Sequence, residues 1–321
     1  MPSEIYRQKS WTVLGSPRNP KFTCMSTAYW RKKMELPGRV SFMDGNGDLP
    51  KTEVSTGSST AEIYFNGAQV THFQKKGEPP VLFLSRLSRF HSGAPIRGGA
   101  PIVFPWFGSR EGQPMHGFAR TAAWELKEII PAADGTTTLK YALPDSAEAS
   151  LSTKFTAVYN VTVGTTLGLE LVITNDTVDQ DFTFENCLHS YFHVGDINAV
   201  SVTGLKGCSY LDKCENYARK TQSAEHVKIS QETDQVYLDA GSVMEIHDSS
   251  LARRIRIETT GAHSTVLWNP WIAKAQQMPD FGNDEYLRMI CVESGNVADN
   301  RVTLPAGKSS SLRAVISTHP L

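Results

Sequence analysis

The sequence lacks the features that mark several large classes of protein. No stretch approaches the ~18 consecutive apolar residues that a membrane-spanning helix needs. Apolar residues make up 40% and charged residues 20% of the 321 positions, a balance typical of globular rather than disordered chains. The glycine-containing motif around Arg97 has no G-K-[ST] ending, which excludes a Walker-type phosphate loop there. We therefore expect a globular protein that neither spans a membrane nor uses a P-loop.

The chain also lacks an excess of either charge. Lys and Arg number 32 and Asp and Glu number 33, so the formal net charge is -1. No global field draws the chain toward nucleic acid or a membrane surface. We predict no nucleic-acid partner and no membrane partner, and any anionic ligand must be held by a few local arginines.

Cysteine is scarce, odd in number and scattered, without a C-x-x-C pair, at Cys24, Cys187, Cys208, Cys214 and Cys291. This pattern argues against a disulfide framework and against a zinc ribbon. A reducing compartment is the simplest interpretation, and we predict a cytoplasmic protein.

The first forty or so residues are basic and poor in acids, and they lack the apolar core of a secretory signal. Two interpretations stay open: an organellar transit peptide, or an N-terminal arm that is either disordered or strapped onto the folded domain. We predict a basic N-terminal arm over residues 1–59, ending in the Ser/Thr/Gly stretch TEVSTGSST. A single domain over residues 60–321 should follow.

Beyond that stretch, short runs rich in Val, Ile, Thr, Tyr and Phe alternate with Gly, Asn, Asp and Pro, which is typical of strands and hairpins. The clearest hairpin spans 155–173 around Gly164 to Gly168. WIAKAQQM (271–278) is the one segment that we predict to be helical. No linker or repeat interrupts the domain, so we predict an all-β fold, a large antiparallel β-sandwich.

The stretch FENCLHSYFHVGD (184–196) spaces Glu185, His189 and His193 four apart, which suggests a metal site. Period two along the run 182–194 puts all three on the polar face of a strand. On a strand, residues four apart lie ~13 Å from each other, too far to share one ion. We therefore predict no metal here, a catalytic or simply hydrogen-bonded His189, and His193 at the rim of a cleft.

Glu293 follows the apolar run MICV at the predicted end of a strand. A carboxylate among apolar neighbours is costly unless it is paired or functional. Burial would raise its pKa and suit it to accept a proton near neutral pH. The alternative is a strand-end glutamate that points into water.

Two arginine-containing motifs lie further upstream. In PIRGGAPIVFPWFG, glycines beside Arg97 let the backbone approach a ligand closely, and the guanidinium offers a fork for phosphate or hydroxyl groups. PMHGFAR brings His116 and Arg120 together beside another glycine. Each motif alone fits an ordinary turn. With the clusters around His189 and Glu293, however, they make four polar clusters on β-elements, which suggests that all four belong to one site.

Taken in order, the motifs PIRGGAPIVFPWFG, HGFART, LHSYFHVGDI, GLKGCSYLDK, ETDQVY and WNPWIAKAQQMPDFGNDEYLRMICVESGNV closely resemble the glucose-6-phosphate 1-epimerase (hexose-6-phosphate mutarotase) family. That family is a branch of the aldose 1-epimerase superfamily. The resemblance covers roughly residues 60–318. It implies a β-sandwich of the galactose-mutarotase type.

The resemblance also implies roles for individual residues. His189 is similar to the family's general acid and Glu293 to its general base. Asp234, in ETDQVY, resembles an acceptor for sugar hydroxyls, and His116 resembles a histidine that lines the site.

By the same resemblance, Arg97 and Arg120 bind substrate and hold its 6-phosphate. One departure concerns Met115, since the family often has a ligand-binding glutamine before HGFAR. Met115 cannot make the hydrogen bonds of an amide, and Gln113 lies two residues away. Substrate preference is therefore less well defined than the chemistry.

The activity that the resemblance implies is interconversion of the α and β anomers of a hexose 6-phosphate, with glucose 6-phosphate the expected substrate. Because only protons move, we predict no cofactor and no metal. A small-molecule sugar phosphate is the expected partner, and we predict a monomer. The alternatives are an aldose 1-epimerase that acts on free hexoses, a non-catalytic carbohydrate-binding protein, and a glycosidase built on Glu293 and Asp234.

Overall fold

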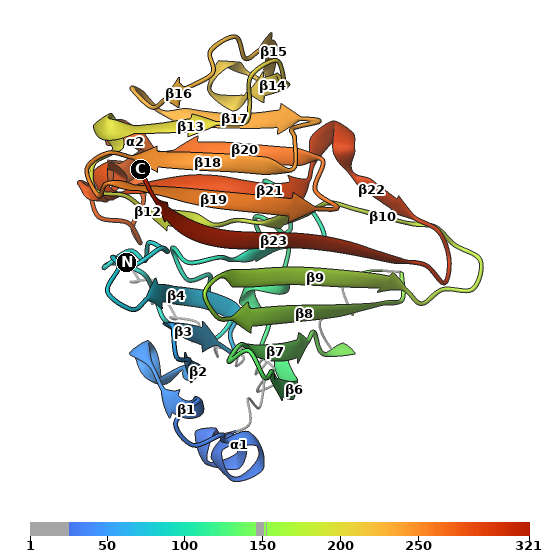
Figure 1. Ribbon diagram of the computed structural model, residues 1–321. Coiled ribbons are helices and arrows are strands. Elements are labelled where there is room, and N and C mark those ends of the chain that lie inside the picture. The colour runs from blue at the N-terminus through green and yellow to red at the C-terminus, as the bar shows by residue number, and fades with distance from the viewer. Residues whose placement is uncertain (1–25, 146–150, 152) are drawn as a thin grey trace, which may run out of the picture.

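The computed structural model of the protein describes residues 26–145, 151 and 153–321, and most of these form antiparallel β-structure (Figure 1). One large sheet has nine strands, in the order β16 (Val227–Lys228), β13 (Val200–Thr203), β18 (Val243–Asp248), β19 (Arg253–Thr260), β23 (Ser309–Pro320), β9 (Leu167–Asn175), β8 (Phe155–Val163), β7 (Thr137–Ala142) and β6 (Glu125–Pro131).

The second large sheet has eight strands, and it carries the candidate site. Its order is β15 (Ala218–Thr221), β14 (Ser209–Asp212), β17 (Thr233–Leu238), β20 (Ser264–Asn269), β21 (Met289–Asn296), β11 (Asn186–Leu188) and β5 (Ile102–Val103), and β12 (Tyr191–His193) also pairs with β21.

Two smaller sheets and two α-helices complete the described part of the chain. The smaller sheets are β1 (Val40–Asp44), β2 (Pro50–Ser55), β3 (Ser59–Tyr64) and β4 (Gln69–Lys75), and β10 (Phe182–Phe184) with β22 (Val302–Leu304). The helices are α1 (Thr27–Met34) and α2 (Trp271–Gln277). Neither helix has the length and apolar character required to cross a membrane.

The inner faces of the two large sheets share one hydrophobic core. Ile255 and Ile316 of the nine-stranded sheet belong to the same buried cluster as Ile290 and Val292 of β21. Burying side chains of this size contributes ~1.5 to 3 kcal/mol each. Because side chains alternate along a strand, Cys291 and Glu293, each next in the chain to one of these two residues, face the outer side of the eight-stranded sheet.

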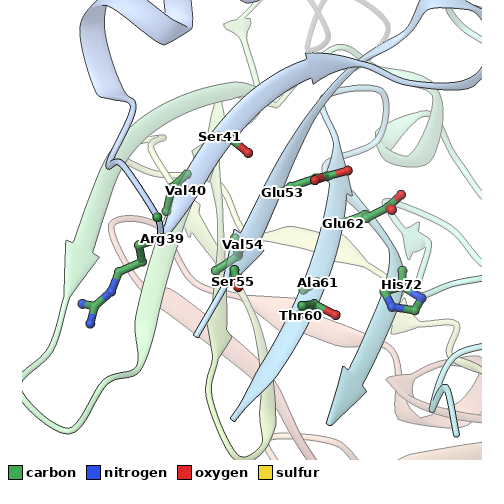
Figure 2. A pocket seen from close by; sticks show the side chains of 11 residues that line it. Arg39, Val40, Ser41, Glu53, Val54, Ser55, Thr60, Ala61, Glu62 and His72 are labelled. Carbon is green, nitrogen blue, oxygen red and sulfur yellow. The ribbon is translucent and has the colours of Figure 1, made fainter. Parts of the chain in front are cut away.

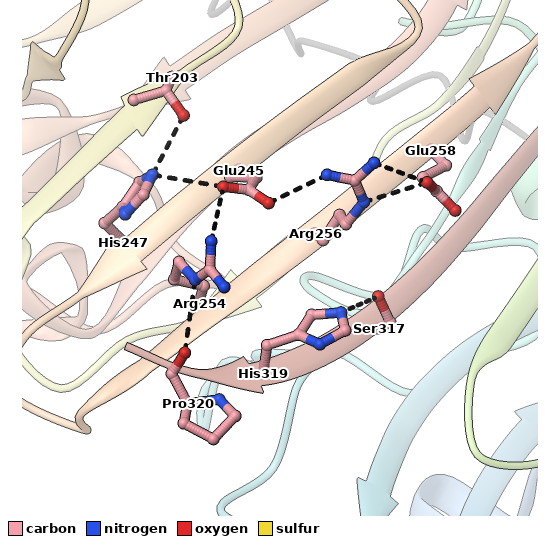
Figure 3. A network of polar contacts seen from close by, with 9 residues as sticks. All are labelled: Thr203, Glu245, His247, Arg254, Arg256, Glu258, Ser317, His319 and Pro320. Carbon is pink, nitrogen blue, oxygen red and sulfur yellow. Dashed lines mark hydrogen bonds and ion pairs between the residues drawn. The ribbon is translucent and has the colours of Figure 1, made fainter.

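The outer face of the nine-stranded sheet is charged (Figure 3). Glu245 of β18 accepts hydrogen bonds from Arg254 and Arg256 of β19, at 3.3 and 3.1 Å. Arg256 also contacts Glu258, at 2.8 Å. These positive and negative groups are already paired with one another, and this face is therefore an ordinary solvated surface.

The structure confirms the all-β prediction and two of its elements. The hairpin predicted over 155–173 is β8 and β9, in register from end to end. The predicted helix is α2. The sequence analysis missed α1, which begins after the N-cap Ser26 and buries Trp30.

The predicted boundary between residues 59 and 60 cuts through a sheet, because β2 pairs with β3 across it. Val40 and Phe42 of β1 are buried in the main core. The folded part therefore begins before residue 60 and includes β1 and β2. Residues 1–25 lie outside the described part, so the basic arm stays a prediction there.

The prediction of one strand with a polar face over residues 182–194 is wrong in detail, because this run forms three short strands, β10, β11 and β12. At the second interruption, the His189 N–H donates to the carbonyl of Pro101 and the Tyr191 N–H to that of Gly99, at 3.0 and 2.8 Å. The chain thus leaves the regular ladder at His189.

Candidate active site

A cavity of about 500 Å³ opens on the outer face of the eight-stranded sheet. It brings together residues that lie far apart in the sequence. Its lining consists of Arg97, Phe107, Gly108, Ser109, Met115, His116, His189, Tyr191, Lys213, Tyr217, Asp234, Trp268, Lys274, Met278 and Glu293.

His189 and Glu293 meet on the floor of this cavity. The strands β11 and β12 both pair with β21, in one register that continues across the interruption and places His189 opposite Glu293. Nδ1 of the histidine lies 3.3 Å from Oε1 of the glutamate, although the angles do not make this contact a hydrogen bond. The two residues are 6% and 1% exposed, so the pair is shielded from bulk water.

Aromatic rings hold the imidazole of His189 in place. The ring stacks on Tyr191, with centroids 4.8 Å apart and planes at 7°. Trp268 and His116 meet it edge-on, at 6.3 and 5.6 Å. Burial lowers the pKa of His189 well below its ordinary range, and the positive charges of Arg120 and Arg97 lower it further.

Glu293 was predicted at the end of a strand, but β21 continues through Asn296 and the glutamate lies inside it. The water-facing alternative is therefore wrong. Burial raises the pKa of Glu293 well above the ordinary range, and repulsion from Asp234 acts in the same direction. Lys213 and Arg120 attract the carboxylate and oppose part of this shift.

Arg97 lines the cavity as predicted, and its guanidinium is anchored on both sides. Nε and Nη2 donate to Oδ2 of Asp280, at 3.3 and 3.2 Å, and Nη1 donates to the hydroxyl of Tyr191, at 3.1 Å. A guanidinium has five N–H donors, so two remain for a ligand. The Asp280 pair fixes the direction in which they point.

Arg120 is not among the residues that line the cavity, which corrects the expectation that it contacts the substrate directly. Its side chain is buried, and Nη2 donates to the carbonyl oxygen of Met115, at 2.7 Å. Burial lowers its pKa to about 10, so the group stays charged at neutral pH. Arg120 therefore acts by holding the segment before His116 and by adding positive charge behind the pair.

His116 lines the cavity and is neutral at physiological pH. Burial, with the positive charges of Arg120, Lys213 and Arg97, lowers its pKa to about 3. Its Nδ1 accepts a hydrogen bond from the Gly108 N–H, at 3.1 Å. In a neutral imidazole the other nitrogen then carries the proton, so Nε2 is a donor.

Met115 also lines the cavity, at 54% exposure, where the family often has glutamine. Gln113 is exposed and is not part of the lining, so it does not replace that amide. This wall of the cavity is therefore apolar.

Asp234, on β17, also lines the cavity and is paired with a residue that the sequence analysis did not single out. Nζ of Lys213 lies 2.8 Å from Oδ2 of Asp234. Burial opposes the charge of this lysine, but the attraction of Asp234 outweighs it and raises the pKa of Lys213. A second lysine, Lys274 of α2, lines the cavity and contacts Glu232 at 3.0 Å.

The donor atoms of His189, Cys291 and Glu293 lie within 4.8 Å of one another, and they are of the types that bind a transition metal. Two features act against a dication there. Burial raises the pKa of the Cys291 thiol well above its ordinary range, and Arg97 and Arg120 place positive charge nearby. The absence of a metal at these three residues stays a prediction.

Glu185 and His193, which are spaced four residues from His189 on either side, lie elsewhere. Glu185 accepts hydrogen bonds from the N–H groups of Phe107 and Ala298, at 2.9 and 2.7 Å, and so fixes two loops. His193 lines a different cavity, together with His72 and residues of the 80–86 segment, so its expected place at the rim of the site is wrong. Of Glu185, His189 and His193, it is His189 that lines the candidate site.

A further hollow of about 460 Å³ lies on the sheet β1–β4 (Figure 2). Its carboxylates, Glu53 and Glu62, are both paired with Lys51, at 2.8 and 2.9 Å. His72 also lines this hollow, but within the described part of the chain no ion pair joins it to either glutamate, unlike the close contact of His189 with Glu293.

The family model of the aldose 1-epimerases matches residues 50–317 of this chain. The chain belongs to the aldose 1-epimerase family. The match begins where β2 begins, in agreement with the revised start of the folded part. Membership also confirms the resemblance on which the site residues were assigned, although the role of each residue stays a prediction.

Two relatives bear the name "Putative glucose-6-phosphate 1-epimerase". The one from Cenchrus ciliaris is 34% identical over 270 residues, which cover 81% of this chain and 82% of the relative. The one from Escherichia coli (strain K12) is 34% identical over 260 residues, which cover 79% and 86%. The crystal structure of a "putative mutarotase (YeaD)" from Salmonella typhimurium has a TM-score of 0.82 at 30% identity, covering 89% of this chain and 96% of that one. The mutarotase type of β-sandwich is thus confirmed.

Several residues of this aldose 1-epimerase site escaped the sequence analysis. Tyr191 follows His189 by two positions, so the period-two pattern alone placed it on the same face. No such signal marked Lys213, Lys274 or Asp280. Each lies on a different segment of the chain from its ion-pair partner, which is Asp234, Glu232 and Arg97 respectively. Their proximity depends on the order of strands in the sheet.

Proposed function

We propose that this protein interconverts the α and β anomers of a hexose 6-phosphate, with glucose 6-phosphate the substrate, by acid/base-catalysed opening and closure of the ring. The main observation that supports this proposal is the contact of 3.3 Å between His189 and Glu293 at the bottom of a cavity of about 500 Å³. A cavity of that size accommodates a single sugar phosphate. Relatives named glucose-6-phosphate 1-epimerases support the same substrate.

In the forward direction, Glu293 takes the proton of the C1 hydroxyl while His189 gives a proton to the ring oxygen. The C1–O5 bond breaks, and the C1 aldehyde can rotate before it closes again. On closure the two residues exchange roles, so the pair returns to its starting state. Each proton transfer typically contributes ~10²- to 10⁴-fold to the rate.

The pair needs one proton to perform this cycle. Burial raises the pKa of Glu293 and lowers that of His189, so both shifts disfavour the charged forms. No electron pair leaves the substrate, so the cycle uses no redox group.

The positive residues of the cavity support recognition of a phosphate. Arg97 has two free N–H donors and a fixed orientation, which suits a charge-assisted hydrogen bond to the 6-phosphate. Lys274 lines the same cavity with its side chain 42% exposed, and it adds a mobile charge. Arg120 contributes to the positive field rather than to a direct contact.

Asp234 and His116 complete the contacts to the sugar. The carboxylate of Asp234, oriented by Lys213, accepts from a sugar hydroxyl. Nε2 of the neutral His116 donates to a second sugar oxygen.

The test is the rate of anomer exchange, measured by exchange NMR, for glucose 6-phosphate and for free glucose. We expect a much larger kcat/KM for the phosphate ester. Equal values for the two sugars would favour the aldose 1-epimerase on free hexoses. Absence of exchange with any sugar would favour a binding protein, and release of reducing sugar from a glycoside would favour a glycosidase.

We also propose that the protein acts as a monomer in the cytoplasm, with the sugar phosphate as its partner. Four cysteines lie in the described part of the chain and all four are free, which supports a reducing compartment. Light scattering of the purified chain tests the oligomeric state, and microscopy of the full chain carrying a fluorescent tag tests the location.

A further inference from the structure

The carboxyl group of Glu293 has a second neighbour besides His189. The thiol of Cys187 donates a hydrogen bond to Oε2, at 3.5 Å, whereas His189 faces Oε1. Within the described part of the chain, no other side chain donates a hydrogen bond to this carboxyl group. The two oxygens of Glu293 therefore have different surroundings.

The position of this thiol is fixed by its neighbours. Cys187 is fully buried in a small apolar cluster that includes Val103, Val236 and Val266. Its partner across the ladder is Gly295, and a Cβ there would lie only 2.9 Å from the sulfur. The absence of a side chain at Gly295 leaves room for the sulfur to reach diagonally to Glu293.

We propose that Cys187 is a positioning residue for the general base, because its S–H group holds Oε2 of Glu293 and leaves Oε1 facing His189 and the sugar. The proposal rests on the proposed function of the His189–Glu293 pair. A thiol donates to a carboxylate, and a donor of this kind favours the ionised form of its acceptor. Burial raises the pKa of the Cys187 thiol well above its ordinary range, so it keeps its proton.

The other charged groups around Glu293 stay unchanged when Cys187 is replaced. Asp234 repels the carboxylate, while Lys213 and Arg120 attract it, and His189 lies opposite. A change in the pH dependence of a Cys187 variant therefore reports the loss of the thiol contact.

The experiment measures kcat and KM for glucose 6-phosphate across pH in the wild type and in Cys187→Ala and Cys187→Ser. Loss of the donor raises the pKa of Glu293, so the profile of Cys187→Ala should move to higher pH. On the acidic side of the optimum its kcat should fall by roughly 5- to 10-fold, with little change in KM. Cys187→Ser restores a donor, so both effects should be largely reversed.

Two further variants separate a contact from a packing effect. Cys187→Val removes the donor but keeps the space filled, so it should show the same shift as Cys187→Ala and serves in its place if that variant does not fold. Cys208→Ala removes a partly buried thiol that lies outside the cavity lining, and it should leave the position of the profile unchanged.

A Cys187→Ala or Cys187→Val profile that coincides with the wild type would overturn the proposal. So would a Cys187→Ser variant as impaired and as shifted as Cys187→Ala, since the thiol would then only fill space. A wild-type protein that does not exchange the anomers of any sugar phosphate would instead refute the proposed function, before any variant is compared.

Discussion

The imidazole of His189 meets the carboxyl group of Glu293 across an interruption in the eight-stranded sheet, with Nδ1 at 3.3 Å from Oε1. The backbone leaves the ladder at His189, but the register of β11 and β12 against β21 continues. The interruption thus keeps the pair aligned while the backbone of His189 bonds to Pro101.

Replacement of either member of this pair should abolish most of the activity. We expect kcat for glucose 6-phosphate to fall by ~10²-fold or more in His189→Asn and in Glu293→Gln, because each removes one proton-transfer group. His193→Asn is the matched control, since that histidine lines a different cavity. Exchange NMR gives the rates, and near wild-type rates in either active-site variant would contradict the assignment.

The pH dependence of the single variants should separate the two groups. The wild type should show a bell-shaped profile, because the pair is inactive with two protons and with none. Any residual activity of His189→Asn should rise with pH in one step, as Glu293 ionises, with a midpoint above the 4.5 of an ordinary glutamate because burial raises its pKa. A midpoint at or below 4.5 would show that Glu293 is not in the environment described here.

Arg97 should determine the preference for a phosphate ester. In Arg97→Met, the ratio of kcat/KM for glucose 6-phosphate to that for glucose should fall by ~10- to 100-fold, the contribution of one hydrogen bond to a charged group. Arg86→Met is the control, because this arginine is exposed and lies outside the cavity lining. An unchanged ratio in Arg97→Met would exclude Arg97 as the phosphate ligand.

Lys274 should contribute a weaker, salt-dependent attraction. We expect KM for glucose 6-phosphate to rise by ~2- to 5-fold in Lys274→Met at low salt, and less at high salt, because a half-exposed charge is screened. Lys228→Met removes an exposed lysine of β16 that is not part of the cavity lining, and its KM should not change. If the KM of Lys274→Met equals that of Lys228→Met, Lys274 does not contribute to binding, and recognition of the phosphate depends on Arg97.

Glu245 should stabilise the outer face of the nine-stranded sheet (Figure 3). Burial opposes its charge, but the hydrogen bond from Arg256 and the charge of Arg254 lower its pKa below 4.5. A depressed folded-state pKa adds stability above the unfolded-state value, and this is lost as the pH falls through the folded-state value. Glu245→Gln should therefore reduce the free energy of unfolding by ~0.5 to 1 kcal/mol at pH 7.

The difference between wild type and Glu245→Gln should nearly vanish at pH 2 to 3, which urea denaturation at the two pH values would show. Glu258→Gln removes one ion pair instead of two and should have a smaller effect at pH 7. A difference of the same size at both pH values would mean that the substitution acts through packing rather than charge.

Much of the architecture could be predicted from the sequence because it depends on local patterns. Alternation of apolar and polar residues gave the strands and the hairpin of β8 and β9, and a polar residue among apolar neighbours marked both His189 and Glu293. The break at His189 could not be predicted, since it depends on hydrogen bonds to the 99–101 segment.

The sequence by itself determined the fold class, through the period of its side chains, and it singled out His189 and Glu293 as candidates for proton transfer. Only the tertiary structure decided which groups meet. It gave Arg97 the partner Asp280, placed Arg120 outside the cavity lining and set the thiol of Cys187 against Glu293. The physical reason is that these contacts depend on strand order and register, which join distant segments: Cys187 and Glu293 are 106 positions apart, and Arg97 and Asp280 are 183 apart.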